Sequence, residues 1–305
     1  MGQEQIEHIP VLSNQLAERI ILPPDGVMVD ATIGHGGHSY LFGHTLGQNG
    51  ILIGFDLDEK ALEKARERLK TLICRVILIH ANFSQISDEL HKKGIEKVDF
   101  ILADLGVSSS QLADAEFGLS FFQDMPLDMR IDKRIQTSAA DIVNDLDEKS
   151  LADLIYRFGE DRASRRIAHL IVQTRKAYPI TTTGRLAEIV CKASGRATKG
   201  RWSRIHPATR TFQALRIAVN GELENLEALL DSAPQLLKSG GRIAVISFHS
   251  LDDRLVKNNF RKNKSEGIYE IVTKKPLIPT RLEISENRRS RSAKLRIAQK
   301  ITEGE

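Results

Sequence analysis

A chain of 305 residues is long enough for one large α/β domain and a second, smaller one, because single hydrophobic cores stop growing near this size. Hydrophobic residues make up 41% and charged residues 28%, which excludes a disordered or fibrous chain. The N-terminus lacks a signal-peptide pattern, and no apolar run approaches ~18 residues, so we expect a cytoplasmic protein without membrane contact. Cys74 and Cys191 lack C-x-x-C spacing and are expected to be small buried hydrophobes.

The first third of the chain alternates short apolar runs with helical periodicity, a pattern typical of βαβ units in a parallel sheet. One helix is expected over Glu59–Leu72, where Ala61, Leu62 and Ala65 begin an apolar face. Four strands are predicted in this part, at Val27–Ala31, Ile51–Asp56, Val76–His80 and Phe100–Asp104. This predicts an α/β fold with a Rossmann-like sheet.

The alternation stops after Asp104, where Gly106–Met129 is rich in Gly, Ser and Phe and a helical region follows over Ala139–Gly195. We therefore predict an inserted all-helical domain over 109–205. The sheet domain is predicted to comprise 1–108 and 206–305, with a single helix at the start of its second part followed by further strands. That helix carries apolar residues at Phe212, Leu215, Val219, Leu223, Leu226 and Leu230, and the strands are expected at Arg242–Phe248, Tyr269–Thr273 and Lys294–Gln299.

The charges are segregated along the chain, although the net charge is only +4. Asp99–Asp161 holds 14 acids and 5 bases, whereas Arg196–Arg216 and Arg288–Lys300 each hold six bases and no acid. Basic segments without compensating acids are typical of phosphate contact. A solvated surface neutralised elsewhere in the fold is equally compatible with these charges.

A glycine-rich turn, Gly34–His38, directly follows the first predicted strand, and Asp56 ends the next strand 22 positions beyond Gly34. A carboxylate there can accept both hydroxyls of an adenosine ribose, so the pattern favours a nucleotide-like cofactor over a purely structural turn. The G-x-G-x-x-G spacing of dinucleotide enzymes is absent. Asp30 beside the turn suits a cofactor with an ammonium group and would repel a pyrophosphate, which favours S-adenosylmethionine over NAD.

Two further residues follow predicted strands and are expected at the same edge of the sheet. Phe83 follows the third strand and could flank an adenine, and Asp104 ends the fourth and could face the reacting atoms. The alternatives are an ordinary buried aromatic for Phe83 and a turn or helix cap for Asp104.

The sequence resembles the bacterial ribosomal small-subunit RNA methyltransferase H family over nearly its whole length. The blocks that carry the resemblance occur in the family's order: His8–Leu12, Gly34–Ser39, Asp104–Gln111, Pro126–Arg130, His206–Arg216, Ile246–Leu251 and Arg289–Arg296. The resemblance implies methylation of the N4 amino group of a cytidine in the decoding region of 16S ribosomal RNA. It also implies that the helical insertion recognises the substrate, and it is compatible with a homodimer.

The resemblance further implies the residues that bind S-adenosylmethionine. These are Gly36, Gly37, His38, Asp56, Phe83, Asp104 and Gln111. For the substrate RNA, the basic segment predicts contacts through Arg201, Arg204, His206 and Arg210. No cluster with metal-ligand spacing is visible, so no metal is expected.

A cytidine N4 is a poor nucleophile, and a hydrogen-bond acceptor would localise its lone pair and take the departing proton. We hypothesise that Asp104 does this, with Ser247 and His249 nearby; a structural role is the alternative for the histidine. The chain lacks the prolines and aromatic that follow the fourth strand in other amino-methyltransferases, which leaves Phe121, Phe122, Trp202 or Phe248 to stack on the base. Three other functions remain open: methylation of another RNA, a nicotinamide dehydrogenase, and a non-catalytic ribosome-assembly factor that binds RNA.

Overall fold

The computed structural model describes residues 10–195 and 206–302 of the chain. The chain forms two compact units, each described separately below. Unit 1 contains Met1–Gly106 and Leu223–Glu305, and unit 2 contains Val107–Glu222. No helix among the described residues is long and apolar enough to cross a membrane.

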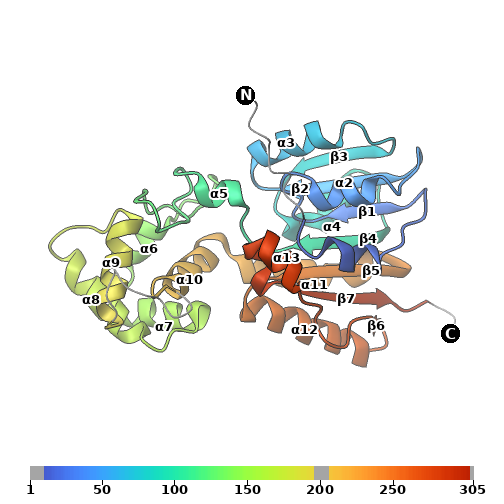
Figure 1. Ribbon diagram of the computed structural model, residues 1–305. Coiled ribbons are helices and arrows are strands. Elements are labelled where there is room, and N and C mark those ends of the chain that lie inside the picture. The colour runs from blue at the N-terminus through green and yellow to red at the C-terminus, as the bar shows by residue number, and fades with distance from the viewer. Residues whose placement is uncertain (1–9, 196–205, 303–305) are drawn as a thin grey trace. The chain divides into compact units, whose positions relative to one another are not determined.

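Unit 1 is built on a seven-stranded sheet with the order β3-β2-β1-β4-β5-β7-β6 (Figure 1). The strands are β1 (Val27–Asp30), β2 (Ile51–Asp56), β3 (Arg75–His80), β4 (Val98–Asp104), β5 (Leu237–Ser247), β6 (Tyr269–Ile271) and β7 (Lys294–Lys300). The first five run parallel, and β7 is antiparallel to both β5 and β6. The predicted α/β fold class and all seven predicted strands are confirmed, although β5 begins at Leu237 rather than at Arg242.

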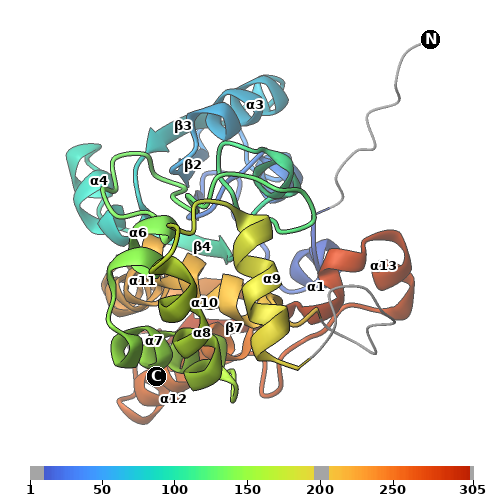
Figure 2. The same ribbon diagram turned by 90° about the vertical axis from the view of Figure 1, so that its left-hand side faces the viewer.

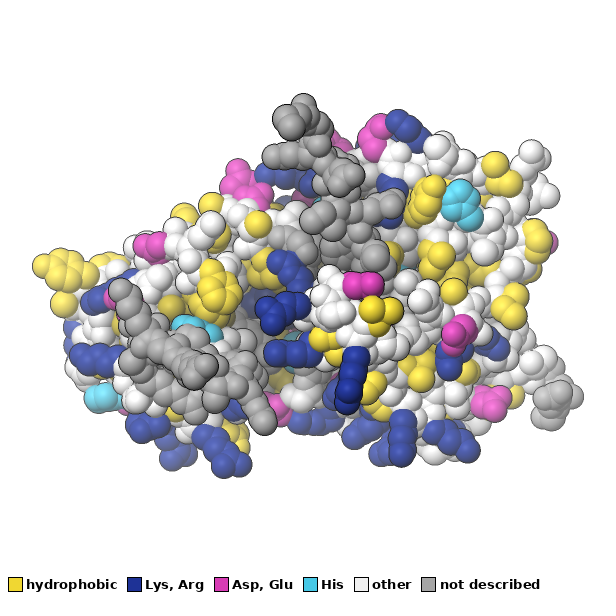
Figure 3. All heavy atoms as spheres, in the orientation of Figure 1, with side chains coloured by type: hydrophobic (Ala, Val, Ile, Leu, Met, Phe, Trp, Pro, Cys, Tyr) yellow, Lys and Arg dark blue, Asp and Glu magenta, His cyan; other side chains and the backbone are white. Residues whose placement is uncertain are grey.

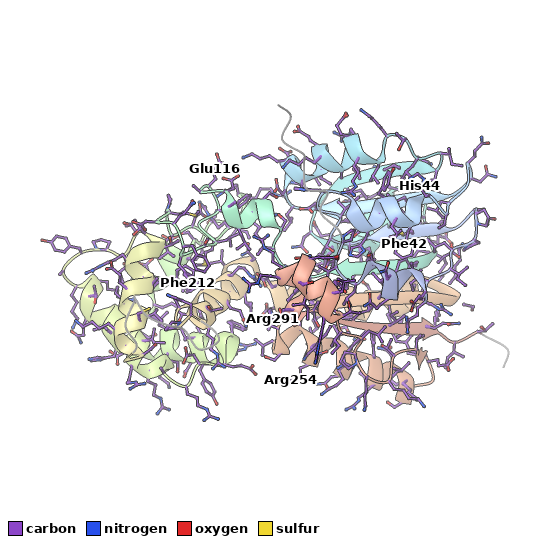
Figure 4. All side chains as sticks on the ribbon, viewed as in Figure 1. Phe42, His44, Glu116, Phe212, Arg254 and Arg291 are labelled. Atoms are coloured by element: carbon purple, nitrogen blue, oxygen red, sulfur yellow. The ribbon has the colours of Figure 1, made fainter. Side chains whose placement is uncertain are left out.

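Helices cover both faces of this sheet, because alternate strand residues point to opposite faces. Unit 1 contains α1 (Ser13–Ala17), α2 (Gly37–Gly43), α3 (Glu59–Leu69), η1 (Phe83–Gln85), α4 (Ile86–Lys92), α11 (Glu222–Leu236), α12 (Ser250–Ser265), α13 (Arg281–Glu286) and η2 (Arg288–Ser292). On one face Phe42 of α2 packs against Phe100 of β4, with ring centroids 5.4 Å apart (Figure 4). On the other, Ile101 of β4 shares a core with α4, α11 and α12. Unit 1 is therefore a three-layer α/β structure.

The crossover helix α3 shows how local sequence positions these layers. Asp58 caps its N-terminus by accepting hydrogen bonds from the backbone N–H groups of Lys60 and Ala61. Its buried residues are Ala61, Leu62, Ala65 and Leu69, which confirms the predicted apolar face. The helix ends at Leu69, three residues before the predicted end.

Unit 2 is helical, and its helices share one hydrophobic core. They are α5 (Ser109–Ala113), α6 (Ala139–Asp145), α7 (Glu148–Gly159), α8 (Ser164–Arg175), α9 (Thr183–Ala193) and α10 (Thr209–Asn220). Figure 2 shows α7, α8 and α9 together at the front, and each contacts the next in sequence. Phe212 of α10, labelled in Figure 4, belongs to the same core.

The single helix predicted from Phe212 to Leu230 is wrong, because the structure contains two helices there. Gly221 ends α10 in the left-handed region, with φ of 58°, and α11 begins at the next residue. The apolar residues of α10 pack into the core of unit 2, whereas Leu226 and Leu230 of α11 pack beneath the sheet. The second part of the sheet unit consequently begins at Leu223 and not at residue 206.

A partly buried ion pair fixes the loop of unit 2 that contains the Pro126–Arg130 block. Asp128 accepts hydrogen bonds from Arg130 Nε at 2.7 Å and Nη2 at 2.9 Å, and Lys133 Nζ lies 3.1 Å away. Burial by itself would raise the pKa of Asp128, but the bonds from Arg130 and Lys133 lower it to about 2. Met129, between the paired residues, has a φ of 64°, and its carbonyl accepts a bond from the Asn220 side chain at 2.8 Å. This carboxylate therefore holds its loop in place.

Candidate active site at the sheet edge of unit 1

The candidate site of unit 1 lies where its parallel strands end. Asp30 ends β1, Asp56 ends β2, Asp104 ends β4 and Ser247 ends β5. Because the carboxyl ends of parallel strands lie at one edge of a sheet, these side chains share that edge with the glycine turn that follows β1.

The glycine turn connects β1 to α2 through left-handed backbone. Gly36 has a φ of 76°, donates its N–H to the Ile33 carbonyl at 2.8 Å and precedes the first residue of α2. A Cβ on the adjacent Gly37 would lie 2.9 Å from Pro10 Cγ, so the absence of a side chain there leaves room for Pro10. Both predicted cofactor-binding glycines thus shape the turn, and their contact with a cofactor stays a prediction.

Asp56 is held against the same turn by two backbone donors. Its Oδ2 accepts from the Gly34 N–H at 2.8 Å, and its Oδ1 accepts from the Asp58 N–H at 2.9 Å. Removal from water raises the pKa of Asp56 to about 6, and these hydrogen bonds offset only part of the shift. Each carboxylate oxygen can accept more than one hydrogen bond, so both remain able to receive a hydroxyl from a ligand.

Asp30 is buried, whereas the predicted contact with the ammonium group of a cofactor requires an accessible carboxylate. The side chain is only 2% exposed, and its oxygens accept bonds from Ser39 Oγ at 2.7 Å and from the Thr32 N–H at 3.2 Å. Burial raises the pKa of Asp30, and the Ser39 hydroxyl and nearby His38 lower it in part. Asp30 therefore stabilises the turn from inside the fold.

Asp104 and His38 form the polar pair at the centre of the edge. His38 Nε2 lies 3.5 Å from Asp104 Oδ2, and the His38 side chain is 6% exposed. Among the described residues, neither ring nitrogen of His38 nor Asp104 Oδ1 has a hydrogen-bond partner, although all three atoms are buried. Buried polar atoms without partners are costly, and in a functional site they are the atoms expected to meet a ligand.

Phe83 begins η1 directly after β3 and is half-buried against the core beneath the sheet. The Asn82 side chain fixes this turn by accepting the Ser84 N–H at 2.9 Å. The backbone thus holds Phe83 near the end of β3, as predicted, and its contact with an adenine stays a prediction.

Ser247 and His249 make bonds that belong to the fold. The Ser247 side chain is 2% exposed, and its hydroxyl donates to the Lys294 carbonyl at 3.3 Å. His249 is the N-cap of α12, where Nδ1 accepts the Asp252 N–H at 3.3 Å and Nε2 lies 3.0 Å from Asp252 Oδ2. Both side chains therefore take part in the fold at the end of β5, and their predicted catalytic roles stay predictions.

Gln111 belongs to unit 2 and takes part in the start of α5. Its Oε1 accepts the Ser108 N–H at 2.9 Å, while its own N–H donates to Ser108 Oγ at 3.2 Å, which completes a capping box. The side chain is 7% exposed. Its predicted contact with the cofactor stays a prediction.

The predicted RNA contacts divide into two groups. Arg201 and Arg204 lie outside the described residues. His206 stacks on Phe121 with ring centroids 4.5 Å apart, its Nδ1 accepts the Ala208 N–H at 3.2 Å, and burial lowers its pKa. Arg210 donates to the Glu160 carbonyl at 2.9 Å. The structure therefore shows internal roles for His206 and Arg210 within unit 2.

Thr32 joins the turn to β4 but was absent from the predicted site. The Asp104 N–H donates to its Oγ1 at 2.7 Å, so this hydroxyl positions the residue that we consider catalytic. Ser39 likewise holds the buried Asp30. Small hydroxyl residues near a glycine turn carry no pattern that separates these roles from ordinary turn chemistry. The described residues contain no group of three or more His, Cys, Asp or Glu that could hold a metal ion.

A doubly wound sheet with an antiparallel β7, a glycine turn after β1 and an acid at the end of β2 defines the class as a Rossmann-like methyltransferase. The chain belongs to the MraW methylase family, whose model matches residues 5–301. This confirms the resemblance noted in the sequence.

Three curated relatives span almost the whole chain, and each is named ribosomal RNA small subunit methyltransferase H. The protein of Clostridioides difficile is 45% identical, with 97% of this chain and 100% of the relative covered. That of Acidobacterium capsulatum is 48% identical, with coverage of 97% and 99%. That of Synechococcus elongatus is 48% identical, with coverage of 96% and 95%. Among solved structures, an rRNA methylase from Streptococcus thermophilus aligns over 95% of this chain and 94% of its own, with a TM-score of 0.45 and 12% identity.

Proposed function

We propose that this protein transfers a methyl group from S-adenosylmethionine to the N4 amino group of a cytidine in the decoding region of small-subunit ribosomal RNA. The observation that carries the proposal is the match of nearly the whole chain to a methylase family, together with relatives named for the RNA of the small subunit. A cytoplasmic location agrees with that substrate, and a homodimer stays a prediction.

The residues at the sheet edge fit S-adenosylmethionine. When bound, this cofactor supplies an electrophilic methyl group on a sulfonium centre. Asp56, which is anchored by the Gly34 and Asp58 N–H groups, retains acceptor capacity for two ribose hydroxyls. The left-handed backbone at Gly36 exposes the turn without a side chain to block a ligand.

Asp104 is the proposed proton acceptor of the reaction. The lone pair of a cytidine N4 is conjugated with the ring, and a hydrogen bond from the amino group to a carboxylate localises it on nitrogen. Asp104 Oδ1 is a buried acceptor with no hydrogen-bond partner among the described residues, so binding a substrate amino group there would satisfy it. Thr32 fixes the Asp104 backbone, while Ser247 and His249 stabilise the neighbouring end of β5.

Unit 2 is proposed to recognise the RNA, as the position of the insertion in the chain suggests. Arg201 and Arg204 remain the proposed phosphate contacts of its basic segment. The internal bonds of His206 and Arg210 instead support a role for these two residues in holding that segment onto unit 2.

The experiment that tests this function is transfer of a labelled methyl group to small ribosomal subunits purified from a strain that lacks the gene. We expect N4-methylcytidine on nucleoside analysis of the RNA. A different methylated nucleoside would show that the protein methylates another target. Binding of the cofactor without methyl transfer to subunits or free RNA would overturn the proposed activity and indicate a non-catalytic factor.

A further inference from the structure

Unit 1 contains a cavity of about 300 Å³ beyond the end of β5. It is lined by Phe248 and His249 at the start of α12, by Ile278 and Ile284 around α13, and by Arg291 and Lys294 around η2 and β7. Its volume is at the lower end of the range for ligand sites, and suits a group the size of a nucleoside. The site residues discussed above place no ligand group in this cavity.

The aromatic wall of the cavity connects it to the proposed reacting end. Phe248 is half-buried, and a Cβ built on Gly106 would lie 3.4 Å from its Cδ2 atom. The ring therefore lies over the backbone two residues beyond Asp104. Of the four aromatics that could stack on a base, Phe121 is stacked on His206, Trp202 lies outside the described residues and Phe122 is 85% exposed. Phe248 lines the cavity of unit 1.

The basic segment Arg288–Lys300 contributes an available charge to this cavity. Lys294 and Arg296 form ion pairs with Asp253 at 3.1 and 2.7 Å, and these two cations are thereby neutralised within the fold. Arg291 is exposed and makes no ion pair within the described part of the chain. Figure 4 shows Arg291 beside α13. An unpaired guanidinium beside an aromatic wall suits a nucleotide, because the guanidinium can bind a phosphate while the base stacks.

The surface that continues from the cavity is also basic. The helix α12, which begins at the cavity, carries Arg254, Lys257, Arg261, Lys262 and Lys264. Lys and Arg side chains gather over this helix on the face shown in Figure 3. Such a surface attracts the phosphates on either side of a bound nucleotide.

We propose that this cavity binds one unpaired nucleotide of the RNA substrate, with its base stacked on Phe248 and its phosphate bound by Arg291. The inference rests on the proposed function for the identity of the RNA. It adds a substrate-binding site in unit 1, outside the inserted unit that the sequence pattern identifies with recognition.

Three variants at two residues test the site in methyl transfer to small subunits from the deficient strain. Phe248→Ala is expected to raise the KM for subunits about 10- to 100-fold, and Phe248→Trp to restore most of it, because the lost contact is a base stack. Arg291→Ala is expected to raise the KM about 10-fold and to reduce the salt dependence of subunit binding by about one phosphate contact. The affinity for S-adenosylmethionine should stay within about twofold in each variant, since neither residue is among those proposed to bind it.

Arg66→Ala is the matched control, because Arg66 is an exposed arginine of α3 that does not line the cavity. The proposal is overturned if Arg291→Ala and Phe248→Ala, both folded by their melting curves, bind subunits as the control does. Ultraviolet crosslinking of the wild-type protein to subunits gives a readout independent of turnover. A crosslinked peptide containing Phe248 is expected, even if the methylated nucleoside proves different; crosslinks that are confined to other peptides would count against the cavity.

Discussion

The carboxylates of the two units differ in what surrounds them. In unit 2, Asp128 receives two bonds from one guanidinium, and its pKa falls to about 2. In unit 1, Asp56 is bound only by backbone N–H groups and its pKa rises to about 6, while Asp104 has a buried oxygen without a partner among the described residues. The fold of unit 2 thus stabilises the Asp128 anion, whereas Asp56 and Asp104 in unit 1 keep oxygens that can still accept hydrogen bonds.

This difference separates a structural acid from a functional one. A paired carboxylate adds stability to the fold, but its acceptor capacity is already used. An unpaired carboxylate at a ligand edge reduces stability, and its remaining capacity can be used by a cofactor or a substrate. If this interpretation is right, equivalent substitutions should impair activity in unit 1 and stability in unit 2.

The largest effect is expected from Asp104→Asn. The variant keeps the side-chain shape but replaces the anionic acceptor, so kcat should fall about 10²- to 10⁴-fold, the usual contribution of a positioned base. Single-turnover methyl transfer and calorimetric titration of S-adenosylmethionine measure turnover and cofactor affinity separately. Asp88→Asn, at an exposed residue of α4, is the control for removal of a charge. Near-normal turnover with intact cofactor binding would contradict the role of Asp104.

Asp56→Asn should weaken S-adenosylmethionine binding about 10- to 100-fold, because one of two hydroxyl bonds to a charged acceptor is lost. The ligand-free variant should differ little in stability from the wild type at pH 8, because the amide avoids the cost of ionising a buried group but loses one of the two backbone hydrogen bonds that Asp56 accepts. The raised pKa of Asp56 means that its ionisation costs stability as the pH increases from about 4 to about 6, and the amide avoids that cost. Melting curves and titrations at pH 8 test both parts, and a variant that is destabilised yet binds normally would contradict both.

The same carboxyl predicts a pH dependence for the wild type. Protonation of Asp56 replaces an acceptor by a donor, so the affinity for S-adenosylmethionine should decrease as the pH falls through about 6. Titrations between pH 5 and pH 8 should show this decrease in the wild type and a flatter profile in Asp56→Asn. Identical profiles in the two proteins would assign the titration to a different group.

For unit 2, Asp128→Asn should destabilise the fold by about 1 kcal/mol at neutral pH, because solvent around the partly exposed partners screens the interaction that lowers the pKa. Because the folded pKa is lowered, the stabilisation by Asp128 is present above about pH 4 and is lost as the pH falls toward 2. Hydrogen exchange across residues 115–135 should increase, whereas the affinity of the folded variant for S-adenosylmethionine should not change. Loss of cofactor binding without loss of stability would contradict the contrast between the units.

Much of the fold could be predicted from the sequence, because strand and helix periodicities are local properties. The seven strands and the crossover helix α3 follow from them. The end of α10 at Gly221 could not be predicted from the sequence, because apolar residues continue at helical spacing on both sides of it. The two helices nevertheless pack into different hydrophobic cores. Asp56 and Asp104 could be placed at one edge because each ends a parallel strand, but the burial of Asp30 and the cap formed by His249 depend on tertiary contacts.

The smallest effect is expected at two glycines in left-handed backbone, Gly36 in unit 1 and Gly221 in unit 2, with φ of 76° and 58°. Alanine in this conformation is unfavourable by about 1 kcal/mol, so Gly36→Ala and Gly221→Ala should reduce stability by similar amounts. Only Gly36→Ala should also weaken S-adenosylmethionine binding, because the strained turn holds Asp56 through the Gly34 N–H. Thermal unfolding of the two variants measures the loss of stability, and titration with S-adenosylmethionine measures the loss of affinity. An equal loss of affinity in both variants would mean that the turn has no special part in binding.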